Sequence, residues 1–123
     1  MKILIVEDSK FVQNMTSKLI GHHFPEVQML TAADGETGYR LFCSEQPDII
    51  LTDLLMPKLT GQELIRLIKQ DDPNSRVVVL SADVQKITRD ELDQLGILAF
   101  INKPLDAEKA ERLVGILKEI FYA

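Results

Sequence analysis

The sequence predicts an α/β domain in which helices cover both faces of a five-stranded parallel sheet. Two observations lead to this prediction: five short runs are almost continuously apolar, as in strands buried on both faces, and a longer amphipathic segment follows each run. The apolar runs are Ile3–Val6, Val27–Thr31, Ile49–Thr52, Val77–Leu80 and Leu98–Ile101. Such alternation favours parallel strands joined by right-handed crossovers, so we expect the doubly wound strand order 2-1-3-4-5.

The intervening helices are predicted from capping residues and apolar stripes. Four helices are preceded by side chains that can cap a helix N-terminus: Ser9, Asp34, Thr60 and Asp106. The first helix is expected to end at Gly21, and the fourth to run roughly over residues 84–95 and stop at Gly96. The apolar sides of the five predicted helices are, in chain order, Phe11, Val12, Met15 and Leu19 on the first; Tyr39, Leu41 and Phe42 on the second; Leu64, Leu67 and Ile68 on the third; Ile87, Leu92 and Leu95 on the fourth; and Ala110, Leu113, Val114, Leu117 and Ile120 on the fifth.

Length and composition fit one globular domain over residues 1–123, because a chain of 123 residues can bury a substantial core. The formal net charge of −5 argues against unaided binding to nucleic acid or an anionic membrane. The single cysteine, Cys43, excludes an internal disulfide, and we expect it to pack on the second helix. No membrane-length apolar run or signal peptide is evident, so the sequence predicts a cytoplasmic domain.

Polar and charged residues follow four of the five predicted strands. They are Glu7 and Asp8 after the first, Asp53 after the third, Ser81 after the fourth and Lys103 after the fifth. In a doubly wound sheet the crevice lies at the carboxyl ends of the strands, where the winding reverses between strands 1 and 3. Each residue alone has an ordinary explanation as a cap, turn or solvated side chain. Their joint placement is what indicates a site.

Three carboxylates at one edge of the sheet cannot all ionise without compensation. Lys103 supplies one positive charge, and oxygen ligands with partial hydration suit Mg²⁺. A metal, an ammonium and a hydroxyl together could clamp a phosphoryl group, and an aspartate can itself become an acyl phosphate. The sequence therefore predicts phosphoryl chemistry at Asp53.

These motifs make residues 1–121 resemble the receiver domain of two-component response regulators, including the chemotaxis-type single-domain regulators. The motifs that carry the resemblance are Ile3–Ser9, Ala33–Gly35, Pro47–Asp53, Met56–Pro57, Gly61, Ser81–Ala82 and Lys103–Pro104. Together they are highly specific, whereas any one alone would not be. The resemblance implies a flavodoxin-like fold.

The resemblance also implies a role for each site residue. Asp53 would accept a phosphoryl group from the phosphohistidine of a sensor histidine kinase or phosphotransfer protein. Mg²⁺ would be held by Glu7, Asp8, Asp53 and the backbone carbonyl of Leu55. Lys103 would contact a phosphoryl oxygen, and its peptide bond to Pro104 would be cis.

A conformational switch is implied as well. Ser81 would move to grip the phosphate, Phe100 would turn inward, and the equilibrium between inactive and active forms would shift. Partners, a second copy of the chain among them, would meet the surface of the fourth helix, fifth strand and fifth helix. Such a protein is no enzyme beyond catalysing its own phosphorylation and dephosphorylation. Its target would be a downstream protein or an output domain of a longer chain.

Several positions depart from the family pattern. Glu7 replaces the commoner aspartate, Thr60 stands where Asp or Asn often precedes the glycine of the third helix, and Phe100 lacks the hydroxyl of the commoner tyrosine. Leu55 is apolar beside the site, and we expect it to hinder the hydrolytic water and lengthen the phosphorylated lifetime.

Three rival functions remain to be weighed. An aspartate-nucleophile phosphatase would carry a D-x-D motif after the first strand, where this chain has Glu7-Asp8-Ser9. A phosphorylation-independent interaction module is disfavoured by the presence of both Asp53 and Lys103. A flavin-binding domain would need a loop rich in Ser, Thr and Gly where the two acids stand.

Overall fold

The computed structural model describes residues 1–82 and 85–122, and its sheet has the predicted topology. The five strands are β1 (Lys2–Val6), β2 (Gln28–Ala32), β3 (Ile49–Thr52), β4 (Val77–Ser81) and β5 (Ala99–Asn102). All neighbouring pairs are parallel, in the order β2-β1-β3-β4-β5. The predicted fold class is therefore confirmed, and the strand bounds differ from the predicted runs by no more than one residue.

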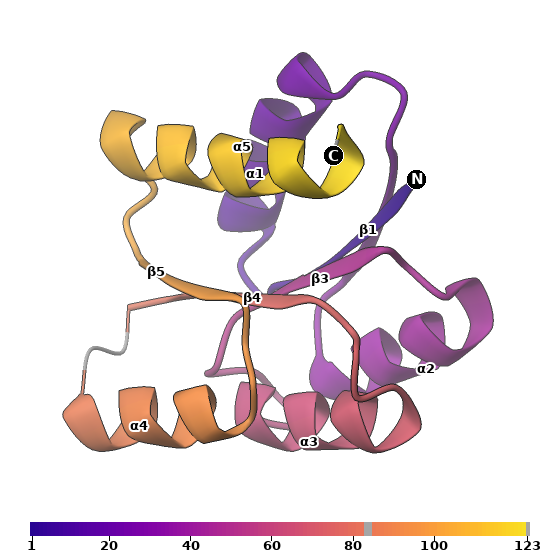
Figure 1. Ribbon diagram of the computed structural model, residues 1–123, viewed down its shortest axis with the longest axis vertical. Coiled ribbons are helices and arrows are strands. Elements are labelled where there is room, and N and C mark those ends of the chain that lie inside the picture. The colour runs from indigo at the N-terminus through magenta and orange to yellow at the C-terminus, as the bar shows by residue number, and fades with distance from the viewer. Residues whose placement is uncertain (83–84, 123) are drawn as a thin grey trace.

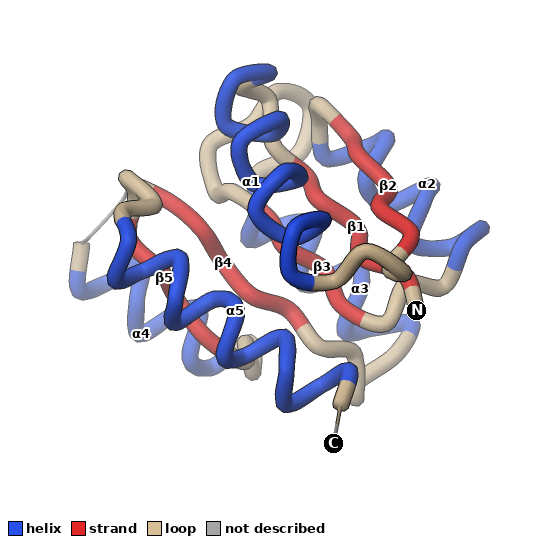
Figure 2. Tube along the Cα trace, turned by 90° about the horizontal axis from the view of Figure 1, so that it is seen from above, coloured by secondary structure: helices blue, strands red, loops and turns tan. Residues whose placement is uncertain are grey.

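Helices cover both faces of this sheet, as Figure 1 shows. They are α1 (Lys10–His23), α2 (Gly35–Glu45), α3 (Gly61–Asp71), α4 (Lys86–Gln94) and α5 (Ala107–Phe121). Helices α1 and α5 lie on one face, and α2, α3 and α4 lie on the other (Figures 1 and 2). Within the two described ranges, none of these helices combines the length and the apolar character that crossing a membrane requires.

The predicted N-caps are confirmed by their hydrogen bonds. Ser9, Asp34 and Asp106 each accept a hydrogen bond from the backbone N–H three residues later. Thr60 does the same and forms a reciprocal capping box with Glu63, so threonine replaces the commoner Asp or Asn without loss of the cap. Gly96 follows α4 with a positive φ, as predicted, whereas Val84 and the side chain of Ile87 lie outside the described residues.

The orientation of α1 corrects the prediction. Phe11 and Met15, expected on the buried side, are 73% and 39% exposed. The buried side is instead formed by Gln13, Thr16 and Ile20. Gln13 can be buried because its amide donates to the carbonyls of Glu7 and Ala32, and the Thr16 hydroxyl donates to the carbonyl of Val12. Hydrogen bonding, which apolar periodicity does not detect, therefore decides which side of α1 faces the sheet.

The predicted end of α1 and the predicted packing of Cys43 are also wrong. Helix α1 continues through Gly21 to His23 and ends at Phe24, whose N–H bonds to the carbonyl of Ile20. Gly21 serves close packing, since a Cβ there would lie 3.2 Å from Cε of Met29. Cys43 is exposed on α2.

Two apolar clusters hold the layers together. One joins the sheet to α2, α3 and α4 through side chains such as Leu4, Ile50, Ile65 and Leu92. The other joins the opposite face to α1 and α5. Because successive strand residues enter opposite clusters, both faces of each central strand are buried, and the carboxyl ends of these strands are fixed rigidly.

The start of α3 is packed directly against the chain that follows β3. The N–H of Gly61 donates to the carbonyl of Leu54 at 2.8 Å. A Cβ at Gly61 would lie 2.3 Å from the carbonyl oxygen of Asp53 and 2.7 Å from Cα of Leu54. Glycine is therefore required at this position by backbone proximity.

We expect Gly61→Ala to lower the free energy of unfolding by about 1–3 kcal/mol, because the added methyl group must displace backbone. Gly115→Ala is the matched control, since a Cβ there meets no atom within 4 Å among the described residues. In the interior of α5 this change should stabilise the protein by up to about 1 kcal/mol. Urea unfolding measures both, and equal effects in the two variants would contradict the packing argument.

Candidate functional site

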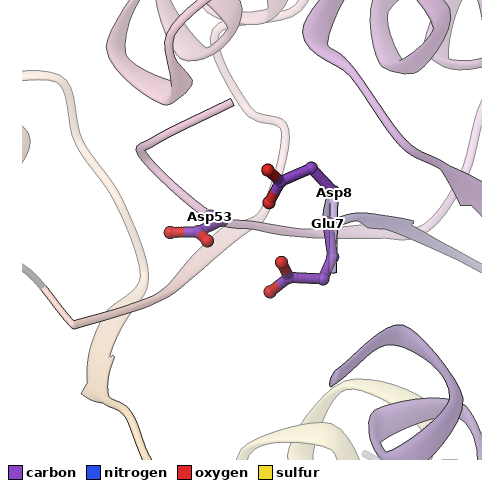
Figure 3. Close-up of side chains that lie close together, drawn as sticks. All are labelled: Glu7, Asp8 and Asp53. Carbon is purple, nitrogen blue, oxygen red and sulfur yellow. The ribbon is translucent and has the colours of Figure 1, made fainter. Parts of the chain in front are cut away.

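The carboxyl ends of β1 and β3 bring the three predicted acids together. Val6 pairs with Thr52 in the sheet, and the N–H of Asp53 donates to the carbonyl of Val6 at 3.0 Å. Glu7, Asp8 and Asp53 follow directly, and their carboxylates converge in Figure 3. One oxygen of each lies within 4.8 Å of the others. Glu7 and Asp53 are only 4% and 8% exposed, whereas Asp8 is open to solvent.

Lys103 reaches this cluster from the end of β5. Its ammonium Nζ lies 2.6 Å from Oε1 of Glu7 and 2.9 Å from Oδ2 of Asp53. Its backbone N–H donates to the carbonyl of Ser81, and its peptide bond to Pro104 is cis, as the resemblance implied. One ammonium therefore bridges two buried carboxylates that come from different strands.

Backbone N–H groups hold the second oxygen of each buried carboxylate. Oε2 of Glu7 accepts from the N–H of Ser9 at 3.0 Å, and Oδ1 of Asp53 accepts from the N–H of Leu54 at 2.7 Å. Each carboxylate is thus fixed by one ammonium contact and one backbone contact. This leaves both groups oriented rather than free to rotate.

The pKa values of two site residues, Glu7 and Lys103, are shifted by their electrostatic environment. Burial raises the pKa of the Glu7 carboxyl, assisted by the charge of Asp53 and opposed by hydrogen bonds from Lys103 and Ser9. Burial acts to lower the pKa of the Lys103 ammonium, but the hydrogen bonds to Glu7 and Asp53 outweigh it and raise that pKa. Lys103 therefore stays charged at neutral pH, and the cluster has more carboxylates than nearby ammonium groups.

This donor set fits a hard divalent cation. Three carboxylate oxygens lie close enough to share one ion, and the exposed Asp8 leaves the cluster accessible to a hydrated ion. The side chain of Leu55 is 70% exposed, two residues beyond Asp53 in the loop that follows β3.

Of the remaining predicted residues, Ser81 lies at this edge of the sheet and Phe100 lies further back along β5. Ser81 is the last residue of β4 and is buried, in register with Asn102 of β5. Phe100 is only 5% exposed, in the interior of β5. The structure thus brings Glu7, Asp8, Asp53 and Lys103 into one cluster and places Ser81 and Phe100 on the two strands beside it.

Sequence reasoning missed residues that support the backbone of the site. Gln13 holds the carbonyl of Glu7, and the buried hydroxyl of Thr52 donates to the carbonyl of Asp53 at 2.9 Å. Thr52 could have been recognised from the sequence, because it is a polar residue at the end of an apolar strand. No comparable sequence signal distinguishes Gln13 from a solvated helix residue.

A doubly wound sheet with an acidic cluster and a lysine at its carboxyl edge defines the receiver class of signalling domains. The model of the response regulator receiver domain matches residues 3–115, and the chain belongs to that family. It is therefore a receiver domain of two-component and phosphorelay signalling, similar to CheY.

Individual relatives agree with this assignment. The chemotaxis protein CheY of Thermotoga maritima is 31% identical, over 97% of this chain and 96% of that protein. The N-terminal domain of an uncharacterized Wolinella succinogenes protein is 37% identical, with a TM-score of 0.89 and coverage of 99% and 94%. A CheX–CheY–BeF3–Mg²⁺ complex from Borrelia burgdorferi contains a chain that is 28% identical, with a TM-score of 0.87 and coverage of 98% and 89%.

Other curated relatives are longer than this chain. It spans 7% of the hybrid signal transduction histidine kinase D of Dictyostelium discoideum and 52% of the probable C4-dicarboxylate response regulator DctR of Bacillus subtilis. Receiver domains of this kind therefore also occur as parts of larger proteins.

Glu7→Gln should change how stability depends on pH. Because burial raises the pKa of Glu7, the folded state binds this proton more tightly than the unfolded chain does. That contribution to stability is present below the ordinary pKa of 4.5 and is lost as the pH rises through the raised value. We expect the unfolding free energy of the variant, relative to the parent, to increase from acid to neutral pH.

Urea unfolding at a series of pH values, with a chelator present, measures this difference. Glu111→Gln on the exposed side of α5 removes the same charge and serves as the control. A difference between Glu7→Gln and the parent that is independent of pH, or that follows the control, would contradict the role assigned to burial.

Proposed function

We propose that this receiver domain is a phosphorylation-controlled switch in which Asp53 accepts a phosphoryl group from a phosphohistidine. The donor would be a sensor histidine kinase or a phosphotransfer protein. One observation carries the proposal: the buried Asp53 carboxylate lies in contact with the Lys103 ammonium and within the Glu7–Asp8 acidic cluster. In this proposal the attacking oxygen of Asp53 lies beside the charges that a phosphoryl group requires.

The transfer exchanges one bond for another. A carboxylate oxygen of Asp53 attacks phosphorus, the P–N bond of the phosphohistidine breaks, and the imidazole leaves as the neutral histidine after taking up a proton. The Leu54 N–H fixes the other carboxylate oxygen, and the Lys103 ammonium can turn from the carboxylates to the incoming phosphoryl oxygens.

In this proposal Mg²⁺ is held by Glu7, Asp8, Asp53 and the backbone carbonyl of Leu55. When bound, the ion neutralises charge on the phosphoryl oxygens. Two observations support this set: the mutual proximity of the three carboxylates, and the presence of Mg²⁺ and BeF3 with a similar CheY in the Borrelia burgdorferi complex.

The output of the switch belongs to the same proposal. Ser81 would grip the phosphate, Phe100, which is already buried in this structure, would be held in its inward position, and the surface of α4, β5 and α5 would change toward a protein partner or a second copy of the chain. The association of CheY with CheX in the related complex supports a protein partner. We propose that residues 1–123 form one cytoplasmic receiver domain that catalyses only its own phosphorylation and dephosphorylation.

Acetyl phosphate with Mg²⁺ should add one phosphoryl group to the parent chain, acid-stable and labile to hydroxylamine, as expected for an acyl phosphate. Intact-mass spectrometry measures the adduct. Asp53→Ala should abolish it, and a chelator should suppress it in the parent. Persistence of the adduct in Asp53→Ala would refute the assignment to Asp53, and repeated turnover of unrelated phosphate esters would favour the phosphatase alternative.

Leu55→Asn should shorten the lifetime of the phosphorylated form severalfold. The exposed leucine can shield the acyl phosphate from water, whereas an amide at the same position can orient water. Loss of the adduct over time, after removal of the phosphodonor, measures the rate. Leu98→Asn, an exposed leucine that precedes β5 at the opposite edge of the sheet, is the control. Equal rates in Leu55→Asn and the parent would refute the shielding hypothesis.

A further inference from the structure

Phe100 is held by two arginines from different helices. Cζ of Arg89, on α4, lies 4.4 Å from the centre of the Phe100 ring. Nη1 of Arg112, on α5, donates to the Phe100 carbonyl at 2.9 Å. The ring itself belongs to the apolar cluster that also contains Leu92 of α4. Phe100 therefore connects β5 to both neighbouring helices.

The position of Phe100 links these contacts to the functional site. It pairs with Val79 of β4, and its strand leads after two further residues to Lys103, which contacts Asp53 and Glu7. Along the chain, helix α4 connects β4 to β5, and the ends of these two strands carry the site residues Ser81 and Lys103. Figure 1 shows α4 on the same face of the sheet as α3. A movement of α4 relative to Phe100 would therefore act on the carboxyl ends of both β4 and β5.

The arginine–ring contact is attractive and directional. A guanidinium within about 6 Å of an aromatic ring centre is drawn to the face of the ring, more strongly when water is excluded. Here the ring is almost completely buried, whereas Arg89, whose guanidinium lies over the ring, is an exposed residue. A second charged contact of α4, between Glu91 and Arg66 of α3, is an exposed ion pair and contributes less.

We propose that Arg89 is a positioning residue that stabilises the buried position of Phe100 and thereby couples phosphorylation of Asp53 to helix α4. This inference rests on the proposed function, in which phosphorylation favours the inward position of the ring. Arg89 and the phosphoryl group then both favour the conformation in which the Phe100 ring is buried. Without Arg89, a larger share of that stabilisation must come from the phosphoryl group.

The experiment is a titration with beryllofluoride, a phosphoryl mimic, at saturating Mg²⁺. Ring-labelled phenylalanine allows the Phe100 signal to be followed by NMR, with Phe100→Leu identifying it. We expect Arg89→Met to raise the midpoint concentration about two- to fivefold, which corresponds to the usual strength of an exposed to partly buried contact of this kind. Arg89→Lys, which keeps a cation near the ring, should restore most of the parental midpoint.

Arg66→Met is the matched control, because it removes the same charge and a contact of α4 without touching Phe100. Its midpoint should equal that of the parent. Acetyl phosphate labelling of each variant reports Asp53 chemistry separately. If Arg89→Met is labelled normally and its midpoint equals that of the parent, the role of Arg89 is refuted and the proposed function stands. The same holds if Arg66→Met shifts the midpoint as much as Arg89→Met does. A parent that is neither labelled nor changed by beryllofluoride would refute the proposed function and this inference with it.

Discussion

The ammonium group of Lys103 is the interaction on which the site depends, because it allows Glu7 and Asp53 to be buried side by side. Burial raises the pKa of the Glu7 carboxyl, and the neighbouring charge of Asp53 adds to that increase, because two desolvated carboxylates repel each other. Lys103 offsets part of the repulsion and orients one oxygen of each group. It does not neutralise the whole cluster, since Asp8 adds a third carboxylate at the solvent side. The remaining negative charge is what makes the pocket attractive to a divalent cation.

The rest of the fold serves to hold these charges at fixed positions. Each contributing strand is buried on both faces, so β1, β3 and β5 cannot slide without disrupting two apolar clusters. Backbone contacts then fix the chain beyond each strand: Gln13 holds the carbonyl of Glu7, and Gly61 packs against the Asp53–Leu54 peptide. In the proposed transfer, an Asp53 carboxylate held in this way would need little reorganisation.

Sequence alone predicted the features that depend on local pattern. Buried parallel strands are recognisable because both of their faces are apolar, and Thr60 or Asp106 can be recognised as caps because their role is decided within one helical turn. The side of α1 that faces the sheet could not be predicted, because Gln13 is buried only by virtue of two carbonyls that the fold brings to it. For the same reason the cluster of Glu7, Asp53 and Lys103 was predictable as a set, whereas the bridging of both carboxylates by Lys103 required the structure. The contact between Arg89 and Phe100 is tertiary and leaves no periodic trace.

Strand β5 is followed by Lys103, which contacts Asp53, and in its interior it carries Phe100, which contacts α4. Conversion of its carboxylate to an acyl phosphate would add negative charge and further acceptor oxygens beside Lys103, so the ammonium would have to redistribute its contacts. The Lys103 backbone is tied to Ser81 by a hydrogen bond, so a movement of the lysine would affect the ends of β4 and β5 together. These two strand ends flank α4 in the chain, and Phe100 attaches α4 to the middle of β5. Strand β5 would therefore link a change of charge at Asp53 to helix α4. Lys103 makes the contact to Asp53 beyond the carboxyl end of the strand, and Phe100 makes the contact to α4 in its interior.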